Sequence, residues 1–304
     1  MDSEHHRFRG CLLGLACGDA VGTTVEFRPR GTFPPVTDMI GGGPFHLEPG
    51  QWTDDTSMAL CLASSLVETG RFDPHDQMER YWRWYSRGEL SSAGHCFDIG
   101  NATQAALLRF HESGQPYSGS SHPNSAGNGC LMRLAPIPMF AYPDPSSAIQ
   151  LSGDSARTTH AAPECIQASQ LFGAMLYQAL VGLDRDAILF DLPLSDEWMA
   201  VLSPRLASIA RGDYRNKTED EIRGSGYVVE CLEAALWCFY QTCDFRAAIL
   251  KAVNLGDDAD TTAAVCGQLA GAYYGEFGIP ESWRRRLALH DLIVGLADRL
   301  WALR

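Results

Sequence analysis

Apolar residues recur at intervals of three and four along most of the chain, which is the spacing of one face of a helix. Phe8, Cys11, Leu12 and Leu15 share such a face, and Met58, Leu62, Ala63 and Leu66 form another. The same spacing predicts helices over residues 81–85, 101–110, 163–180, 226–240, 261–275 and 280–303. No convincing series of alternating strands accompanies them, so the pattern predicts an all-α fold with many helices.

The chain of 304 residues is 45% hydrophobic, which is enough to bury one substantial core. Loops rich in Gly, Pro and Ser interrupt the helices at residues 28–50, 113–129 and 211–225. Loops of this length inside a compact domain are usually functional or disordered. Because neither a composition shift nor an internal repeat marks a boundary, we expect a single domain over residues 1–304.

Charge and cysteine usage narrow the class of protein. A net charge of −13, from 37 acidic and 24 basic residues, argues against binding to nucleic acid or anionic membranes. The ten cysteines form no CxxC pair and mostly lie in apolar runs, which is typical of reduced thiols. The start of the chain does not resemble a signal peptide, and no run of 18 apolar residues occurs. We expect a cytoplasmic protein.

Clustered Asp and Thr residues precede two of the helical patterns. They are residues 50–60, GQWTDDTSMAL, and residues 254–275, NLGDDADTTAAVCGQLAGAYYG. Either cluster alone is typical of a helix cap, because Asp and Thr accept hydrogen bonds from the first turn. Together they hold more carboxylates than capping needs, and like charges this dense repel unless water or a cation neutralises them. Hard oxygen ligands favour Mg²⁺ or Mn²⁺ over Zn²⁺, so capping and a metal site both stay open.

The segment DADTT also matches the nucleophile box of haloacid-dehalogenase phosphatases. That box ends a buried strand and opens an α/β domain, whereas here a helical pattern precedes it and only 42 residues follow Thr262. An EF-hand is excluded as well, since the glycine and the final glutamate of its loop are missing.

Five segments in order resemble the ADP-ribosylglycohydrolase family over nearly the whole chain. They are GCLLGLACGDAVGTTVEF, GGGPFHLEPGQWTDDTSMAL, FDIGNAT, NSAGNGCLMRLAPI and NLGDDADTTAAVCGQLAGAYYG. The second segment is most similar to the bacterial branch typified by dinitrogenase reductase-activating glycohydrolase. The resemblance implies a compact all-helical fold with a cleft that holds two divalent cations, Mg²⁺ or Mn²⁺.

The resemblance also implies which residues bind those cations. The family's TDD and DxDT motifs fall on Thr53, Asp54, Asp55, Asp258, Asp260 and Thr261. Asp257 stands where the family often has glycine, so it is not expected to be a ligand.

The implied activity is metal-dependent hydrolysis of the glycosidic bond between ADP-ribose and a protein side chain, with arginine as the expected acceptor. Glu26, Asp55 and Asp98 are the implied catalytic residues. From the residues alone, Asp98 is equally well explained as the N-cap of the helix that begins near Asn101.

Residues expected to contact the substrate follow from the same resemblance. They are Asn101, the loop residues Ser125, Gly127, Asn128 and Gly129, then His160 and Tyr227. The loop is expected to receive the diphosphate through backbone N–H groups, and Tyr227 to stack on adenine. The plainer alternatives are an ordinary glycine turn, a structural histidine and a core aromatic.

Two other functions stay open. One is hydrolysis of a serine-linked ADP-ribose or of O-acetyl-ADP-ribose, and the other is ADP-ribose binding without catalysis. The complete acidic motifs argue against the second, because a protein without a metal gains nothing from keeping them. The expected partners are an ADP-ribosylated protein and ADP-ribose, and the chain is expected to be a monomer.

Overall fold

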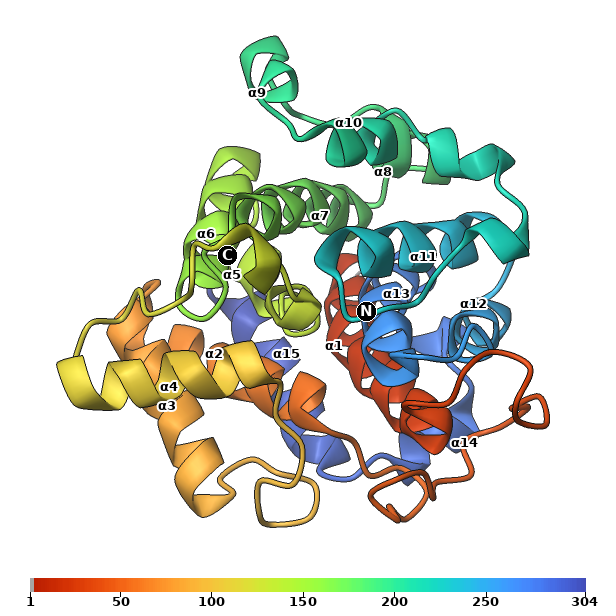
Figure 1. Cartoon of the computed structure of the whole chain (residues 1–304), viewed down its shortest axis with the longest axis horizontal. Helices are drawn as coiled ribbons and strands as arrows, with labels where there is room; N and C mark the ends of the chain where they lie inside the picture. Colours follow the sequence, from red (N-terminus) through yellow and green to blue (C-terminus); the bar gives the residue numbers. More distant parts are fainter. Residues whose placement is uncertain (1–2) are drawn as a thin grey trace.

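Residues 3–304 are described by a computed structural model and consist of α-helices joined by loops and short 3₁₀ turns (Figure 1). The helices are α1 (Ser3–Gly22), α2 (Asp54–Thr69), α3 (Pro74–Arg87), α4 (Asn101–Ser113), α5 (Pro136–Ala141), α6 (Pro145–Arg157), α7 (Pro163–Val181), α8 (Arg185–Phe190), α9 (Asp196–Ala200), α10 (Pro204–Ala210), α11 (Val228–Tyr240), α12 (Phe245–Val253), α13 (Ala259–Tyr274), α14 (Glu281–Arg286) and α15 (His290–Ala302). β structure within these residues is limited to isolated bridges, so the predicted all-α class is confirmed.

Helices α1 and α13 lie side by side at the centre of the molecule (Figure 1). A Cβ atom added at Gly10, Gly14 or Gly18 would lie 2.1, 2.2 or 2.1 Å from a carbonyl oxygen of α13. The two backbones therefore touch directly, which only glycine permits. At the end of α1, a Cβ on Gly22 would lie 2.4 Å from the Cα of Asp260. The C-terminal end of α1 is thus held against the first turn of α13.

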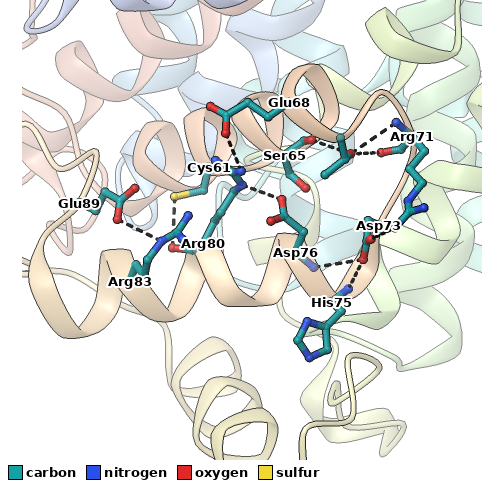
Figure 2. A network of polar contacts seen from close by, with 11 residues as sticks. Cys61, Ser65, Glu68, Arg71, Asp73, His75, Asp76, Arg80, Arg83 and Glu89 are labelled. Atoms are coloured by element: carbon teal, nitrogen blue, oxygen red, sulfur yellow. Dashed lines mark hydrogen bonds and ion pairs between the residues drawn. The ribbon is translucent and has the colours of Figure 1, made fainter.

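The remaining helices bury their apolar faces around this pair in one continuous hydrophobic core. Figure 2 shows how polar contacts join α2 to α3 on the outside of that core. Asp73 caps α3 by accepting the backbone N–H of His75 and Asp76. Arg80 on α3 bridges Asp76, at 2.6 Å, and Glu68 of α2, at 2.9 Å. Within residues 3–304, no helix is long and apolar enough to cross a membrane.

The helices predicted from apolar spacing are present, although the one predicted over residues 81–85 is the much longer α3, which begins at Pro74, and the spacing fails at one place. The spacing over residues 280–303 predicts one helix, but the chain forms α14 and α15 with a break between them. At the break Leu289 has a φ of 54°, and Ala288 exchanges hydrogen bonds with the loop before α2. The Ala288 N–H donates to the Gly50 carbonyl at 2.9 Å, and its carbonyl accepts from the Trp52 indole at 3.1 Å. These tertiary contacts replace the helical hydrogen bonds that the spacing implies.

The glycine contact predicts an asymmetry between two Gly→Ala substitutions. Gly14→Ala should lower the free energy of unfolding by roughly 1–3 kcal/mol, because its Cβ must push the two backbones apart. Gly295→Ala in α15 is the matched control, since nothing lies within 4 Å of its Cβ. It should raise stability by roughly 0.5–1 kcal/mol through helix propensity. Urea unfolding of both variants gives the measurement, and equal effects would contradict the packing argument.

Candidate active site

The two acidic segments meet at the starts of α2 and α13. The Thr53 hydroxyl lies 3.3 Å from an Asp260 carboxylate oxygen, and the Thr261 hydroxyl donates to Asp55 at 3.3 Å. These four residues are buried. Two motifs about two hundred residues apart in the sequence therefore form one carboxylate cluster.

The first turn of α2 is capped by a residue of another helix. Asp19 on α1 accepts the backbone N–H of Thr53 at 2.9 Å and of Thr56 at 3.0 Å. Its carboxylate also accepts the hydroxyls of these threonines, at 2.9 and 2.6 Å. Thr53 occupies the N-cap position, but its side chain does not cap α2, because the hydroxyl donates to Asp19 instead. Sequence reasoning missed Asp19, whose only signal is a charge inside the apolar pattern of residues 8–22.

The first turn of α13 is capped in the same way by Glu26, just beyond α1. Its Oε2 accepts the backbone N–H of Ala259 at 2.8 Å and of Asp260 at 3.2 Å. Carboxylates from outside each helix thus accept the first N–H groups of both helix starts, while the next one in α13, the Thr261 N–H, donates to Asp260 at 2.7 Å. Capping therefore does not explain why the other aspartates of the two motifs are present.

A cavity of about 460 Å³ opens beside the cluster. Of the residues singled out from the sequence, it is lined by Glu26, Asp54, Asp98, Asn101, Gly127, Asn128, Gly129, His160, Asp258, Asp260 and Thr261. Thr53 and Asp55 lie behind this surface, each 1% exposed. Among the described residues that line the cavity, none is Lys or Arg, so its charged groups are all carboxylates.

The donor set fits a hard divalent cation. One carboxylate oxygen from each of Glu26, Asp258 and Asp260 lies within 4.8 Å of the others. Asp55 Oδ2 is buried without a hydrogen-bond partner among the described residues. Burial, followed by repulsion from neighbouring carboxylates, raises the pKa of Asp55 and Asp260 well above the ordinary value. Crowded oxygen donors of this kind are the usual ligands of Mg²⁺ or Mn²⁺, and Glu26 belongs geometrically to the group.

Asp98 lines the same cavity as this cluster and is not a helix cap. Gly100 occupies the N-cap position of α4, so the capping explanation for Asp98 is wrong. Burial, and after it the charges of Asp19 and Asp258, raise the pKa of Asp98 to about 7. A carboxyl group with that pKa can hold or release a proton near neutral pH. Asn101, the first residue of α4, lines the same wall.

The loop at residues 125–129 approaches the cavity through its glycines. Gly127, Asn128 and Gly129 line it, whereas the Ser125 hydroxyl turns away and donates to the His122 carbonyl at 2.6 Å. The backbone N–H groups of Ser125, Gly127 and Asn128 already donate to carbonyls of the protein. Those three N–H groups are therefore not free to receive a diphosphate, contrary to the expectation from the sequence.

His160 projects toward this loop in a fixed, neutral form. A Cβ on Gly129 would lie 2.7 Å from the ring carbon Cε1, so only glycine leaves room for the imidazole. Burial, and after it the charge of Arg133, lowers the pKa of His160 to about 3. Arg133 donates to the Thr159 hydroxyl oxygen at 2.6 Å, and that oxygen lies 2.8 Å from His160 Nδ1. The other ring nitrogen, Nε2, has no hydrogen-bond partner among the described residues and lies beside the glycines of the loop.

Arg133 was also missed by sequence reasoning, which took residues 130–137 only as part of a motif. Its guanidinium is fully buried and donates to the Gly129 carbonyl at 3.0 Å. It therefore fixes both the loop and, through Thr159, the histidine. An arginine inside an apolar pattern is the signal that would have identified it.

Tyr227 lies in a neighbouring hollow that shares Gly127 and Gly226 with the main cavity. Its hydroxyl donates to Glu164 at 2.6 Å, and the Arg205 guanidinium lies 5.6 Å from the ring centroid. The structure thus separates Tyr227 from the carboxylate cluster, on the far side of the glycine loop.

Known proteins resemble the chain over its whole length. The profile of the ADP-ribosylglycohydrolase family matches residues 1–304. The ADP-ribosylarginine hydrolase Tri1 of Pseudomonas putida (strain GB-1) is 47% identical over 97% of this chain and 78% of that protein. The ADP-ribosyl-[dinitrogen reductase] glycohydrolase of Rhodospirillum rubrum is 32% identical over 94% of this chain and 91% of its own length.

A solved structure gives the same result for the fold. A chain described as an ADP-ribosylglycohydrolase-related protein complex superimposes with a TM-score of 0.88 and is 44% identical. The match covers 100% of this chain and 99% of that one.

The capping role of Asp19 predicts that replacing its carboxylate by an amide strongly lowers the stability of the protein. Asp19→Asn would turn an amide N–H₂ toward backbone N–H donors, so unfolding should become easier by roughly 2–4 kcal/mol. Mg²⁺ affinity should fall about 10- to 100-fold, because the cluster loses its support. Asp144→Asn is the matched control, since Asp144 is an exposed N-cap of α6 that accepts Ser146 N–H, and Asn caps equally well. Thermal unfolding and calorimetry give the measurements, and similar values for both variants would refute the role.

The buried carboxylates predict that metal-free protein loses stability as pH rises. Burial and the Asp258 charge raise the pKa of Glu26 to about 8, and the pKa values of Asp54, Asp55 and Asp260 are raised as well. Buried His160, with its pKa lowered to about 3, acts in the opposite direction, but the four raised carboxylates outnumber it. The folded state therefore binds more protons than the unfolded state between about pH 4 and pH 8. Stability in that window falls as pH rises, by up to roughly 1.4 kcal/mol per pH unit for each extra proton that the folded state holds.

The measurement is the melting temperature at pH 5, 6, 7 and 8 in EDTA and in excess Mg²⁺. Mg²⁺ should abolish or reverse the fall, because the cation binds the deprotonated ligands. Asp55→Asn in EDTA should show a smaller fall and a higher melting temperature at pH 8. A melting temperature that rises from pH 5 to pH 8 in EDTA would exclude the buried, uncompensated carboxylates.

Proposed function

The chain belongs to the ADP-ribosylglycohydrolase family, and on that premise we propose that it hydrolyses the bond joining ADP-ribose to an arginine side chain. The observation that carries the proposal is a single shared cavity. Glu26, Asp98 and the acidic starts of α2 and α13 all line it. Two relatives that are 47% and 44% identical are named ADP-ribosylarginine hydrolases, which supports arginine as the acceptor.

We assign to the cluster two divalent cations, Mg²⁺ or Mn²⁺. The proposed ligands are Thr53, Asp54, Asp55, Asp258, Asp260 and Thr261, with Glu26 beside them. When bound, such ions polarise and orient the hydroxyl groups of the distal ribose and offset the negative charge of the diphosphate.

In the proposed reaction, water adds its hydroxyl to C1″ of the distal ribose while the bond from C1″ to the guanidinium nitrogen breaks. The second proton of the water ends on the departing nitrogen, so free ADP-ribose and an unmodified arginine result. Asp98 is the proposed group that moves this proton, because its pKa of about 7 suits either direction of transfer. Glu26 and Asp55 carry negative charge that stabilises the oxocarbenium character of the sugar.

The proposed substrate-binding roles follow from the hydrogen-bonding groups and the space that each residue offers to the cavity. His160 offers its ring nitrogen Nε2 to a phosphate or ribose group, and Gly127 and Gly129 let the substrate approach the backbone closely. We propose that Asn101 contacts the distal ribose and Tyr227 the adenine, while Ser125 and Asn128 shape the loop between them. The Asn128 amide donates to Asp258 at 2.8 Å, so it also ties the loop to the metal cluster.

We further propose that the chain acts as a monomeric single domain over residues 1–304 in the cytoplasm. All ten cysteines are free thiols, which suits a reducing compartment. The proposed partners are an ADP-ribosylated protein and ADP-ribose.

Mass spectrometry of released ADP-ribose tests the proposal directly. An arginine-modified peptide and a serine-modified peptide are incubated with the protein in Mg²⁺, Mn²⁺ or EDTA. We expect release from the arginine peptide only, and only with a cation. Release from serine instead would move the enzyme to the alternative linkage. If neither peptide releases ADP-ribose while ADP-ribose still binds, the chain is a binding protein.

The same assay tests the assigned carboxylates. Asp98→Asn should lower kcat about 10²- to 10⁴-fold, the usual effect of losing a general acid or base, and leave ADP-ribose binding intact. Glu26→Gln should lower both turnover and Mg²⁺ affinity. Wild-type turnover in both variants would remove both residues from the mechanism.

A further inference from the structure

Phe27 is an exposed aromatic residue at the edge of the cavity. Its side chain is 65% exposed, yet it lines the same cavity as Glu26 and Asp98. Its φ is 63°, a left-handed conformation that is strongly disfavoured for a bulky residue. The Phe27 N–H donates to the Asp257 carbonyl at 2.8 Å, and the Asp257 N–H donates to the Arg28 carbonyl at 2.8 Å. This pair of hydrogen bonds holds the strained backbone in place.

The turn held by these two hydrogen bonds points two neighbouring side chains in different directions. Glu26 turns inward to the start of α13, while Phe27 turns outward to the cavity mouth. Because Phe27 buries little surface, its position contributes little to the hydrophobic core. Strain that is maintained without a packing benefit is typical of a functional position.

Phe27 is one end of a row of phenylalanines, which we call the aromatic rim: Phe27, Phe45 and Phe97. The ring centroids of Phe27 and Phe45 are 6.2 Å apart, and those of Phe45 and Phe97 are 5.3 Å apart. Phe97 directly precedes Asp98, so the rim joins the strained turn at Glu26 to the proposed proton-transfer residue. The three rings come from separate segments of the chain.

We propose that the aromatic rim, together with Asp98, binds the guanidinium group of the modified arginine; this proposal rests on the function proposed above. A guanidinium is planar and weakly hydrated, so it stacks on aromatic faces and pairs with carboxylates. An uncharged acceptor such as serine gains neither interaction. The rim therefore selects the acceptor, while the cluster and the glycine loop hold ADP-ribose.

The surroundings of the rim fit a cation supplied by the substrate. The cavity is lined by carboxylates and, among the described residues, by no Lys or Arg. The protein's own arginines stack on other rings, such as Arg28 on Phe33 at 5.5 Å, and no cation–π pair within residues 3–304 involves the rim. Phe97 also packs edge-on against the His95 ring, with centroids 5.7 Å apart, so the exposed Phe27 ring, which lines the cavity, is the part of the rim open to a substrate cation. The nearby field attracts a positive charge.

Steady-state kinetics of Phe27→Leu, which keeps an apolar side chain but removes the aromatic face, test this assignment. The substrates are an ADP-ribosylated arginine peptide and O-acetyl-ADP-ribose, whose leaving group is uncharged. We expect KM for the arginine peptide to rise roughly three- to thirty-fold, the range of one cation–π contact. KM for O-acetyl-ADP-ribose and Kd for ADP-ribose should stay unchanged. Phe27→Trp should retain most of the discrimination.

Phe277→Leu is the matched control, since Phe277 is 68% exposed but does not line the cavity. Phe45→Leu supplies a second variant should the strained turn tolerate no change at Phe27. An unchanged KM for the arginine peptide, or an equal rise for both substrates, would overturn the assignment.

If the wild-type protein does not cleave the arginine peptide, the proposed function fails, and calorimetry then measures the Kd of the intact peptide. Tighter binding than ADP-ribose, lost in Phe27→Leu, would still support the rim, and its absence would refute it.

Discussion

The contact between the backbones of α1 and α13 determines the geometry of the site. Side chains normally keep the axes of two helices 8–10 Å apart, but the glycines at every fourth position of α1 let its backbone touch that of α13. The helices run antiparallel, so the end of α1 is held against the start of α13. Asp19 and Glu26, at and just beyond that end, are therefore placed within hydrogen-bonding distance of two helix starts.

This arrangement separates capping from metal binding. A helix start has unsatisfied N–H groups and a positive dipole end, and its own aspartates would ordinarily satisfy them. Here Asp19 and Glu26 supply those acceptors from outside, so the carboxylates of Asp54, Asp55 and Asp258 are available to a cation. The consequence is a buried group of like charges, whose raised pKa values reflect how unfavourable the ionised cluster is by itself. A bound divalent cation removes this cost, which couples folding of the site to metal binding.

The sequence was sufficient to predict the helices, which depend on nearby residues. It was insufficient to predict contacts between residues far apart in the chain. Apolar spacing located the principal helices, since the apolar face of a helix is formed by residues that are close together in the sequence. The break between α14 and α15 depends on the hydrogen bonds of Ala288 to the Gly50 carbonyl and from the Trp52 indole, which no local pattern contains. For the same reason a carboxylate on α1 could not be recognised as the cap of α2. The motifs pointed to the carboxylates of the cluster, but only the structure shows that Asp19 and Glu26 cap the two helix starts.

The absence of Lys and Arg from the cavity lining of the described residues has a consequence for the order of binding. A diphosphate carries negative charge, and several loop N–H groups that could receive it are already engaged within the protein. Without a cation the carboxylates would repel ADP-ribose, so in the proposed function the cations must be bound before the diphosphate or together with it. The guanidinium of the acceptor contributes a second positive charge at the aromatic rim, on the other side of the scissile bond. The negative cavity can therefore accept an anionic nucleotide because its two positive counterparts arrive with the metal and with the substrate itself.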